Sequence, residues 1–511
     1  MAKEYRIYPG IGIARLGNSR DSFFLSPEIP NVGPIELRAD GTVEPVKQYK
    51  DSNHKLRRQG ARFRVYEVNV DARGHESFTE VIAGNGVAIE WRVELANEKA
   101  GAGYFISEAL PEDPTKPRNP DASQVDLIIK PTFPAISGIN QTVVASADGK
   151  FKGKTVYLGE MRTDSQGRLV VLGGRGISES VPPGQPLGDG SQAPGHRANT
   201  FANNWGWYDD ISDGPVTAIV RIAGQPEQEV SRSAWVIVAP PDFAPYTNGI
   251  TTLYDIAVQA ANLPAPVTPS FMGDVLPILK AAAGLRWVSA LPNWSNISTD
   301  YALLSAKNDA NADQLRRDTI SLLLAIETDG VLQNYHFTTN QKAILNAWAN
   351  GNFTSDFQAS PTVQAVTPAG LDQASLTQAV GGGFFPGIEA GIRMTAPAMY
   401  SAPFRITNKT FNFAGLPQVP HAGFITRTMA CPWQSDFFEC EMQSVTAAWW
   451  PAQRPIDVFV DAETQKPWID SIPNHQALVD KFWMLGLIEK TASGATDSLV
   501  EAERDPAVPH E

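Results

Sequence analysis

The stretch ARFRVYEVNV (61–70) places apolar and polar side chains in near alternation. Alternation with a period of two predicts a strand whose two faces meet different surroundings. Similar short runs recur at VAIEWRVELA (87–96), KTVYLGEM (154–161), RLVVLGG (168–174) and VTAIVRI (216–222). Turn residues at 147–149 and 165–167 favour antiparallel hairpins. The chain up to about residue 238 is therefore expected to be mainly β.

Beyond Pro240-Pro241 the apolar residues follow a helical spacing instead. Helices are predicted over 311–327, 339–351 and 475–488, the last one capped by Asn474. A chain of 511 residues also exceeds the size that a single hydrophobic core usually reaches. We therefore expect an α+β protein with a β-rich N-terminal region of antiparallel sheets (1–240). An α-rich C-terminal region with long irregular loops (241–511) should follow it.

Composition narrows the class of protein. Lys and Arg number 42 against 55 Asp and Glu, a net charge of −13, which makes nucleic acid an unfavourable partner. Hydrophobic residues make up 42% of the chain, yet no run reaches the roughly 18 apolar residues of a membrane helix. The opening MAKEYRIYPG shows no apolar segment of a secretory signal. A cytoplasmic location is the default expectation, with non-classical export left open.

Common catalytic motifs are absent from the sequence. The seven histidines include no pair three or four residues apart, so a helical zinc motif is excluded and no metal is expected. There is no GxSxG motif, and the glycine cluster 173–176 matches neither a dinucleotide nor a phosphate loop, which predicts a turn. Only Cys431 and Cys440 are present, which excludes a disulfide scaffold, an iron–sulfur cluster and an all-cysteine zinc site.

The segment WGWYDDISDGP (205–215) is rich in aspartate. Asp209, Asp210 and Asp213 could ligate calcium, or could serve a carbohydrate site with Trp205 and Trp207 as sugar platforms. The favoured interpretation is a turn whose carboxylates accept hydrogen bonds from local backbone amides.

Basic residues gather in KLRRQGARFRVY (55–66). Because the rest of the region is not basic, we predict that they pair with acidic surface residues and do not bind an anion.

The window 421–455 concentrates unusual chemistry. It contains both cysteines, three tryptophans and the acidic residues Asp436, Glu439 and Glu441. In one interpretation the cysteines are buried or joined in a disulfide, and the tryptophans fill the core. In a second, a cysteine is a nucleophile with His421 as its base. In a third, a cysteine and a tryptophan are joined covalently in a protein-derived quinone, which requires a carboxylate base nearby.

Six blocks of sequence favour the third interpretation by resemblance. They are RIYPGIGIARLGNS (6–19), RRQGARFRVYEV (57–68), NWGWYDDISDGPV (204–216), GGGFFPGIEA (381–390), MACPWQSDFFEC (429–440) and WWPAQRP (449–455). Together, in order over about residues 5–490, they closely resemble the family of L-lysine ε-oxidase and glycine oxidase, the LodA-like quinoproteins. Members of that family carry cysteine tryptophylquinone, a post-translational modification of their own chain.

The resemblance assigns the cofactor residues. The cross-linked cysteine corresponds to Cys440, and the aspartate needed for cofactor formation and proton abstraction corresponds to Asp436, four residues earlier. The tryptophan partner corresponds to Trp450, with the adjacent Trp449 as a competitor. Cys431 stands where the family commonly has an aliphatic residue and is expected to pack in the core. Trp483 lies at a predicted helical core position.

The substrate side of the site is less defined by the resemblance. The family has a histidine near the quinone, whereas this chain offers Phe385 in the FFPGIE block, and His421 is the nearest histidine in sequence. Arg454, Arg427 and Arg393 lie closest in sequence to the matched blocks. An arginine could hold the carboxylate of an amino acid by paired hydrogen bonds.

The resemblance also implies an activity. It is the oxidative deamination of a primary amine, in particular an amino acid, to an aldehyde or keto acid with ammonia and hydrogen peroxide. Dioxygen is the implied electron acceptor, and a different acceptor would make the enzyme a dehydrogenase. A flavin-dependent maturation protein and a homo-oligomer, such as a tetramer, are the implied partners. The alternatives are a family member without cofactor that acts as a binding or structural protein, and a carbohydrate-binding β protein.

Overall fold

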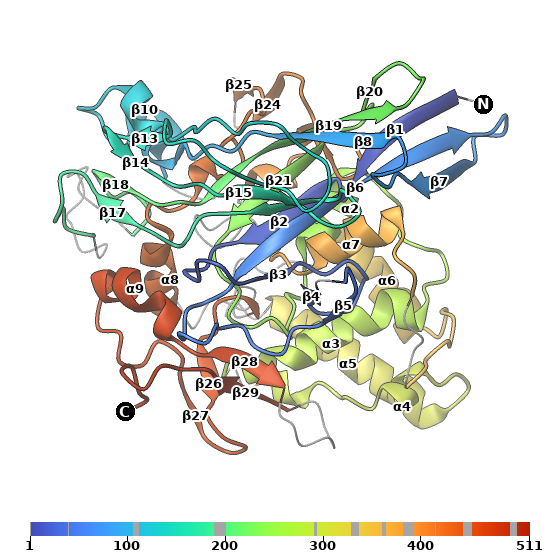
Figure 1. Ribbon diagram of the computed structural model, residues 1–511. Coiled ribbons are helices and arrows are strands. Elements are labelled where there is room, and N and C mark those ends of the chain that lie inside the picture. Colours follow the sequence, from blue (N-terminus) through green and yellow to red (C-terminus); the bar gives the residue numbers. More distant parts are fainter. Residues whose placement is uncertain are drawn as a thin grey trace.

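The computed structural model describes residues 2–38, 40–105, 112–188, 201–290, 294–328, 337–359, 364–381, 392–413, 415–442, 452–490 and 498–511. Strands dominate the first half of the chain and helices the second, which confirms the predicted α+β class. In Figure 1 the blue and green strands form a twisted sheet across the upper half of the molecule. The helices α3 to α7 gather below it on one side, and α8 and α9 lie on the other.

The main sheet is built around the long strand β6 (Arg58–Val70), which contains the run that alternates in the sequence. Strands β1 (Ala2–Tyr8), β7 (Glu76–Glu80) and β16 (Leu169–Leu172) pair with β6 in antiparallel orientation. Along the sheet the order is β11-β8-β19-β21-β2-β6-β16-β15-β12. The other strands on this path are β2 (Ile11–Arg15), β8 (Val87–Val93), β11 (Ile136–Ser137), β12 (Thr142–Val144), β15 (Glu160–Thr163), β19 (Ser212–Ile222) and β21 (Ala234–Ala239).

Most strand pairs are antiparallel, as predicted, but two are parallel. Strand β2 runs parallel to β21, and β3 (Phe23–Leu25) runs parallel to β6. Both pairs join segments far apart in the chain, which local turn signals do not reveal. The predicted strand 154–161 is split, because only Lys154–Thr155 (β14) and Glu160–Thr163 (β15) are extended.

The remaining described strands are short. They are β4 (Ile35–Leu37), β5 (Val43–Pro45), β9 (Gly103–Tyr104), β10 (Asp113–Pro117), β13 (Lys150–Phe151), β17 (Glu179–Ser180), β18 (Trp207–Tyr208), β20 (Gln228–Glu229), β22 (Tyr400–Ala402), β23 (Arg405–Ile406), β24 (Phe411–Phe413), β25 (Leu416–Gln418), β26 (Asp457–Phe459), β27 (Gln465–Pro467), β28 (Leu487–Lys490) and β29 (Leu499–Ala502).

Helices α5 (Ala310–Thr328) and α6 (Thr339–Ala349) confirm two of the predicted helices. The third is only half right. Asn474 caps α9 by accepting from the Ala477 amide at 2.9 Å, but α9 ends at Lys481 and residues 487–490 form β28. β28 pairs with β29, a tertiary contact that overrides the helical periodicity of the local sequence. The other described α-helices are α1 (Gln124–Leu127), α2 (Leu253–Ala260), α3 (Leu276–Gly284), α4 (Tyr301–Ser305), α7 (Pro368–Thr377) and α8 (Trp433–Met442).

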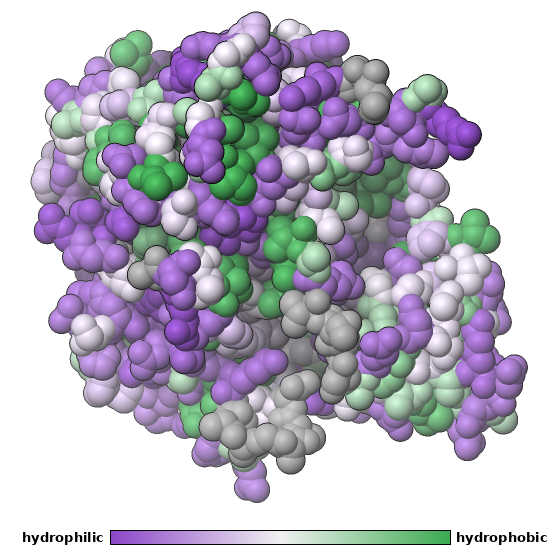
Figure 2. All heavy atoms as spheres, turned by 45° about the vertical axis from the view of Figure 1, so that its right-hand side comes forward, coloured by the Kyte–Doolittle hydropathy of each residue, from purple (hydrophilic) through white to green (hydrophobic). Residues whose placement is uncertain are grey.

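One hydrophobic core joins the two halves of the chain. It includes Phe63 and Trp91 from the sheet together with Trp433, Phe437 and Trp468 from the C-terminal part. The division into regions 1–240 and 241–511 therefore stays a prediction from sequence. On the face drawn in Figure 2 the surface is mainly hydrophilic, with green patches of limited extent. No helix in the described ranges is long and apolar enough to cross a membrane.

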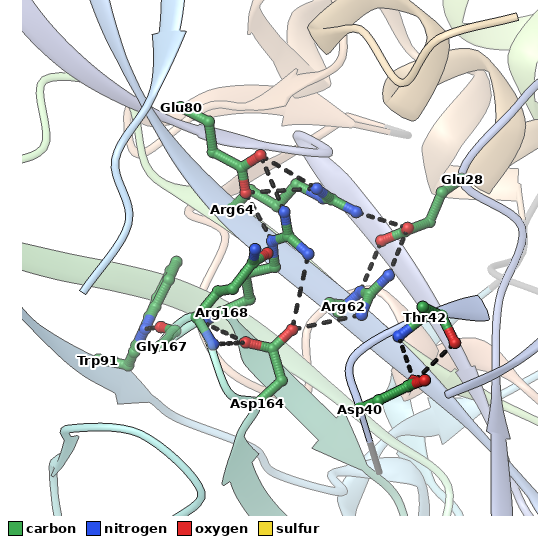
Figure 3. A network of polar contacts seen from close by, with 11 residues as sticks. Glu28, Asp40, Thr42, Arg62, Arg64, Glu80, Trp91, Asp164, Gly167 and Arg168 are labelled. Atoms are coloured by element: carbon green, nitrogen blue, oxygen red, sulfur yellow. Dashed lines mark hydrogen bonds and ion pairs between the residues drawn. The ribbon is translucent and has the colours of Figure 1, made fainter. Parts of the chain in front are cut away.

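Charged side chains of β6 lie inside the fold, where carboxylates from other strands and loops neutralise them. Arg62 donates to both oxygens of Glu28 at 2.8 and 2.6 Å, and Arg64 donates to the same carboxylate at 2.6 Å. Figure 3 shows how Asp164 and Glu80 extend this network. The predicted ion pairing is confirmed for these arginines, but the prediction of surface partners is wrong, because Glu28 and Asp164 are buried.

Trp483 was predicted at a helical core position. It lies in the 3-10 helix Phe482–Met484, is half-buried against the core, and has the Lys55 ammonium 3.3 Å from the centre of its ring.

Removing Glu28 should destabilise the protein strongly. Burial opposes ionisation of Glu28, but Arg62 and Arg64 outweigh it and hold its pKa below the usual range. Glu28→Ala would leave two buried guanidinium groups without this partner, which costs about 3–5 kcal/mol. We expect a clear fall in the melting temperature measured by circular dichroism. Glu227→Ala removes the exposed partner of Arg221 and should cost less than about 1 kcal/mol. Equal losses in the two variants would contradict this account.

Candidate functional site

Helix α8 (Trp433–Met442) carries two of the predicted site residues, Asp436 and Cys440. They stand four residues apart, so the two positions lie on the same face of the helix. The side chain of Cys440 lies outside the described residues, as do Trp449, Trp450 and Phe385. The structure therefore places the helix, and the cross-link itself stays a prediction.

The start of α8 is held by Asp209 from the aspartate-rich segment. The Trp433 amide donates to Asp209 Oδ2 at 2.9 Å, which satisfies one of the free N–H groups at the helix start. Asp209 also forms an ion pair with Lys99, and both side chains are fully buried. Asn97 Nδ2 donates to Asp209 Oδ1 at 2.9 Å. Lys99 and Asn97 could not be predicted as part of this site from the sequence, because no local pattern distinguishes a buried lysine or asparagine from an exposed one.

Asp436 is the most unusual carboxyl group of this region. It is 1% exposed, and its Oδ2 has no hydrogen-bond partner in the described part of the chain. Burial raises the pKa of Asp436 well above its ordinary value, and the charge of Glu439 adds to this, while Lys99 and Arg454 act in the opposite direction. A buried carboxyl with a raised pKa is suited to accept and release a proton near neutral pH.

Two further buried polar atoms lie on the first turn of α8. Trp433 Nε1 and Ser435 Oγ, like Asp436 Oδ2, have no hydrogen-bond partner among the described residues. Buried polar atoms in proteins are normally satisfied. The first turn of α8 therefore holds three buried polar atoms that a further polar group could satisfy.

Asp210 and Asp213 hold distant backbone segments. Asp210 Oδ2 accepts from the amides of Arg175 and Ile177, and Asp213 accepts from the amides of Ile425 and Thr426. The predicted role in a local turn is therefore wrong for both, although carboxylate-to-backbone bonding is right.

The predicted turn at 173–176 is the segment that Asp210 binds. A Cβ on Gly174 would lie 2.4 Å from the Asp210 carboxyl carbon, so only glycine fits this close approach.

Neither a calcium site nor a sugar site finds support in this segment. Across the described ranges no three histidine, cysteine, aspartate or glutamate side chains are grouped to hold a metal ion. Trp207 is buried and donates from Nε1 to the Gln185 carbonyl at 3.1 Å, so its ring is not available to a sugar.

Known proteins match both halves of this chain. The family described as L-Lysine epsilon oxidase N-terminal matches residues 8–238, and the L-lysine epsilon oxidase C-terminal domain matches residues 326–460. The chain belongs to the L-lysine ε-oxidase family. L-lysine 6-oxidase from Marinomonas mediterranea is 29% identical over 554 residues, which cover 86% of this chain and 71% of that protein.

Solved structures of the same M. mediterranea enzyme share the fold. Its crystal structure superposes with a TM-score of 0.71 at 21% identity and covers 98% of this chain and 95% of that chain. The crystal structure of its Schiff base intermediate with L-Lys gives a TM-score of 0.72 at 22% identity, with the same coverage. The similarity in fold thus extends over nearly the whole of this chain, a member of the L-lysine ε-oxidase family.

The other cysteine of this family member is structural. Cys431 is a free, fully buried thiol that donates to the Trp207 carbonyl at 3.3 Å. Burial raises its pKa to about 12, and the charge of Asp209 adds to this. A thiol with so high a pKa is a poor nucleophile. The packing role predicted for Cys431 is confirmed, and its pairing with a histidine base finds no support, because His421 binds Glu98.

Two of the predicted substrate arginines are already neutralised. Arg427 donates to Glu112 at 2.7 and 2.9 Å and to Glu98 at 3.1 Å, and Arg393 donates to Glu112 at 2.6 Å. His421 joins this cluster through Nε2, 3.1 Å from Glu98 Oε1, and this contact raises its pKa. A substrate carboxylate would have to compete with both glutamates.

Arg454 is fully buried beside α8. Its Nε donates to the Phe437 carbonyl and its Nη1 to the Pro455 carbonyl, both at 2.7 Å, and the guanidinium carbon lies 5.2 Å from the centre of the Trp468 ring. The structure thus brings Arg454 near Asp436, while it places His421 in the separate cluster with Glu98.

Asp210→Asn should change stability in a pH-dependent way. Burial raises the pKa of Asp210 to about 7, so the folded chain keeps a proton that the unfolded chain releases near pH 4. The stability gained from this proton is complete below about pH 4 and is lost as the pH rises through 7. Asparagine stays neutral, so the variant should match the wild type at about pH 3.5 and exceed it by about 1–4 kcal/mol at pH 8.

Melting temperatures at the two pH values test this, with the exposed Asp318→Asn as the matched control. A variant less stable than the wild type at pH 8 would contradict the prediction.

Proposed function

We propose that this chain is a cysteine tryptophylquinone-dependent oxidase that deaminates a primary amine, specifically one carried by an amino acid. The products are an aldehyde or keto acid, ammonia and hydrogen peroxide. The observation that carries the proposal is the buried Asp436 carboxyl, unbonded at Oδ2 within the described residues, one helical turn from Cys440 on α8. The relationship to an enzyme named L-lysine 6-oxidase supports the same class of reaction.

The residues of α8 fit the cofactor that the family carries. Cys440 and Trp450 would form it, with Trp449 as the competing tryptophan, and Asp436, four residues before Cys440, would lie on the same face of the helix. The quinone supplies an electrophilic carbonyl for the amine and a two-electron acceptor. No metal is required by this scheme.

Asp436 is the proposed general base. When ionised, its free Oδ2 can accept the proton from the carbon that bears the amine. The burial of Asp436 excludes bulk water, which keeps this oxygen from being solvated and raises its affinity for the proton. The surrounding core, with Phe437 against Trp433 at a ring distance of 4.8 Å, fixes the turn that carries it.

The substrate side of the site concerns Arg454, His421 and Phe385. Arg454 donates to the carbonyl of Phe437, the residue after Asp436, so we propose that it acts on the site by holding this turn of α8. His421 is bonded to Glu98 in the separate cluster, and a substrate-binding role for it is proposed from the sequence. A substrate-binding role for Phe385 is proposed from the sequence. Dioxygen is the proposed electron acceptor, and a flavin-dependent maturation protein and a homo-oligomer are the proposed partners. The carbohydrate-binding alternative lacks support, because Trp207 is buried and Asp209 is paired.

The cross-link has a direct test by mass. Cys440 and Trp450 lie in one tryptic peptide, because no lysine or arginine stands between Arg427 and Arg454. In matured protein the mass of this peptide should show oxygen added and hydrogens lost, and the cross-link should suppress fragment ions between residues 440 and 450. Cys440→Ser should abolish the modified mass and the visible absorbance. Cys431→Ser is the matched control, because its hydroxyl can still donate to the Trp207 carbonyl. Loss of the cofactor in both variants would undo the assignment, and fragment ions that locate the modification on Trp449 would move it by one residue.

Asp436 has a test of its own. Asp436→Ala should give folded protein without quinone absorbance and without peroxide release from amino acids, because the base needed for cofactor formation and turnover is missing. The exposed Asp480→Asn, on α9, is the control and should keep both signals. Absorbance spectra and a peroxidase-coupled screen of L-lysine, glycine and simple amines measure the outcome. A normal spectrum in Asp436→Ala would reject its role. Unmodified wild-type protein that stays inactive after co-expression with a maturation flavoprotein would favour the cofactor-less alternative.

A further inference from the structure

Asp436 shares its buried surroundings with a lysine that is bonded elsewhere. Lys99 lies in the short 3-10 helix η1 (Lys99–Gly101) and is fully buried. Its ammonium forms the ion pair with Asp209, and the charge of Lys99 also acts on Asp436. A buried ammonium costs several kcal/mol unless it is compensated, so its choice of partner matters for the whole site.

Asp209 has two contacts that bear on Asp436. Its Oδ2 accepts from the Trp433 amide, three residues before Asp436 on the same helix, and it also binds Lys99. Positions three residues apart lie on the same side of a helix. The same carboxylate therefore fixes the turn that carries Asp436 and binds Lys99.

We propose that Lys99 and Asp209 form a positioning pair for Asp436. Asp209 fixes the first turn of α8 and retains the Lys99 ammonium, so that in the described part of the chain no cation is bonded to the Asp436 carboxyl. Asp436 thereby keeps an oxygen free to accept a proton. This inference rests on the proposed function, since it concerns the residue that acts there as the base.

The proposal predicts that Lys99 and Asp209 affect the protonation of Asp436 in opposite directions. If Asp209 loses its charge, Lys99 is released to pair with Asp436 and should favour the ionised carboxyl. If Lys99 loses its charge, the Asp436 carboxylate loses the stabilising effect of this ammonium and should hold its proton more tightly. An opposite charge at close range shifts such a midpoint by about 1–3 pH units.

The other charged groups around Asp436 stay in place in this design. They are Glu439 on the same helix, Arg454, which donates to the Phe437 carbonyl of this helix, and His475 on α9. His475 Nε2 lies 3.7 Å from Glu439 Oε2. Because these groups are unchanged, the direction of the shift reports the pair alone.

The test titrates Asp436 directly. Infrared difference spectra of the whole chain, with Asp436→Asn as the subtraction reference, give the carboxylic acid band of Asp436 as a function of pH. For Asp209→Asn, whose oxygen can still accept from the Trp433 amide, the midpoint should fall by about one unit or more. For Lys99→Met it should rise by a similar amount. Two shifts of the same sign, or no shift in either variant, would overturn the proposal.

The double variant guards against a failure to fold. Lys99→Met with Asp209→Asn removes both buried charges and keeps similar volumes, an exchange that proteins often tolerate. Its midpoint should lie within about half a unit of the wild type, because the two effects oppose each other. A double variant displaced by as much as either single variant would also overturn the proposal.

Peroxide release separates this inference from the proposed function. In matured enzyme the pH profile of kcat/KM should shift in the same direction as the infrared midpoint of each variant. If the infrared midpoints shift in opposite directions but no amine yields peroxide, the positioning pair is supported and the proposed oxidase activity is rejected. If peroxide is released but the midpoints do not move, the oxidase activity is supported and the positioning pair is rejected.

Discussion

Compensation of buried charge is the physical constraint on which this structure depends. Arg62 and Arg64 of β6 lie inside the fold, and Glu28 and Asp164 from other parts of the chain neutralise them. Isolated charges of this kind would be prohibitively expensive in a protein interior. Each ion pair therefore specifies a particular docking of segments far apart in sequence. The hydrophobic core supplies the driving force, and the ion pairs restrict which arrangement it can take.

The same rule distinguishes Asp436 from the paired carboxylates around it. Lys99 and Asp209 neutralise each other, and Arg427 and Arg393 are neutralised by Glu98 and Glu112. In the described ranges Asp436 instead keeps an unbonded oxygen at 1% exposure. Local violations of structural rules concentrate at functional sites, where the fold around them maintains the strain. This contrast supports Asp436 as the working residue more strongly than its position in a motif.

Helices and caps with strong local sequence signals could be predicted from the sequence. Helices α5 and α6 and the Asn474 cap follow from periodicity and capping chemistry. Residues 487–490 have helical spacing but form a strand, because pairing with β29 decides their conformation. The parallel pair of β2 and β21 could not be read from turns, since its strands are far apart in the chain.

At the site, the resemblance predicts Asp436 and Cys440, but no pattern in the sequence indicates Lys99. Burial of a lysine depends on the whole fold.

The distance between Asp209 and α8 in the chain has a consequence for how the site comes into being. Asp209 precedes Trp433 by 224 residues, yet the two meet at the first turn of the helix. During synthesis the ribosome delivers Lys99 and Asp209 long before the helix that they hold. The strands of the main sheet and both residues of the ion pair are thus synthesised first, and the first turn of α8 is synthesised late. A chain interrupted before α8 would contain most of the sheet but neither Asp436 nor Cys440, so the proposed oxidation of the chain could begin only after α8 has been made.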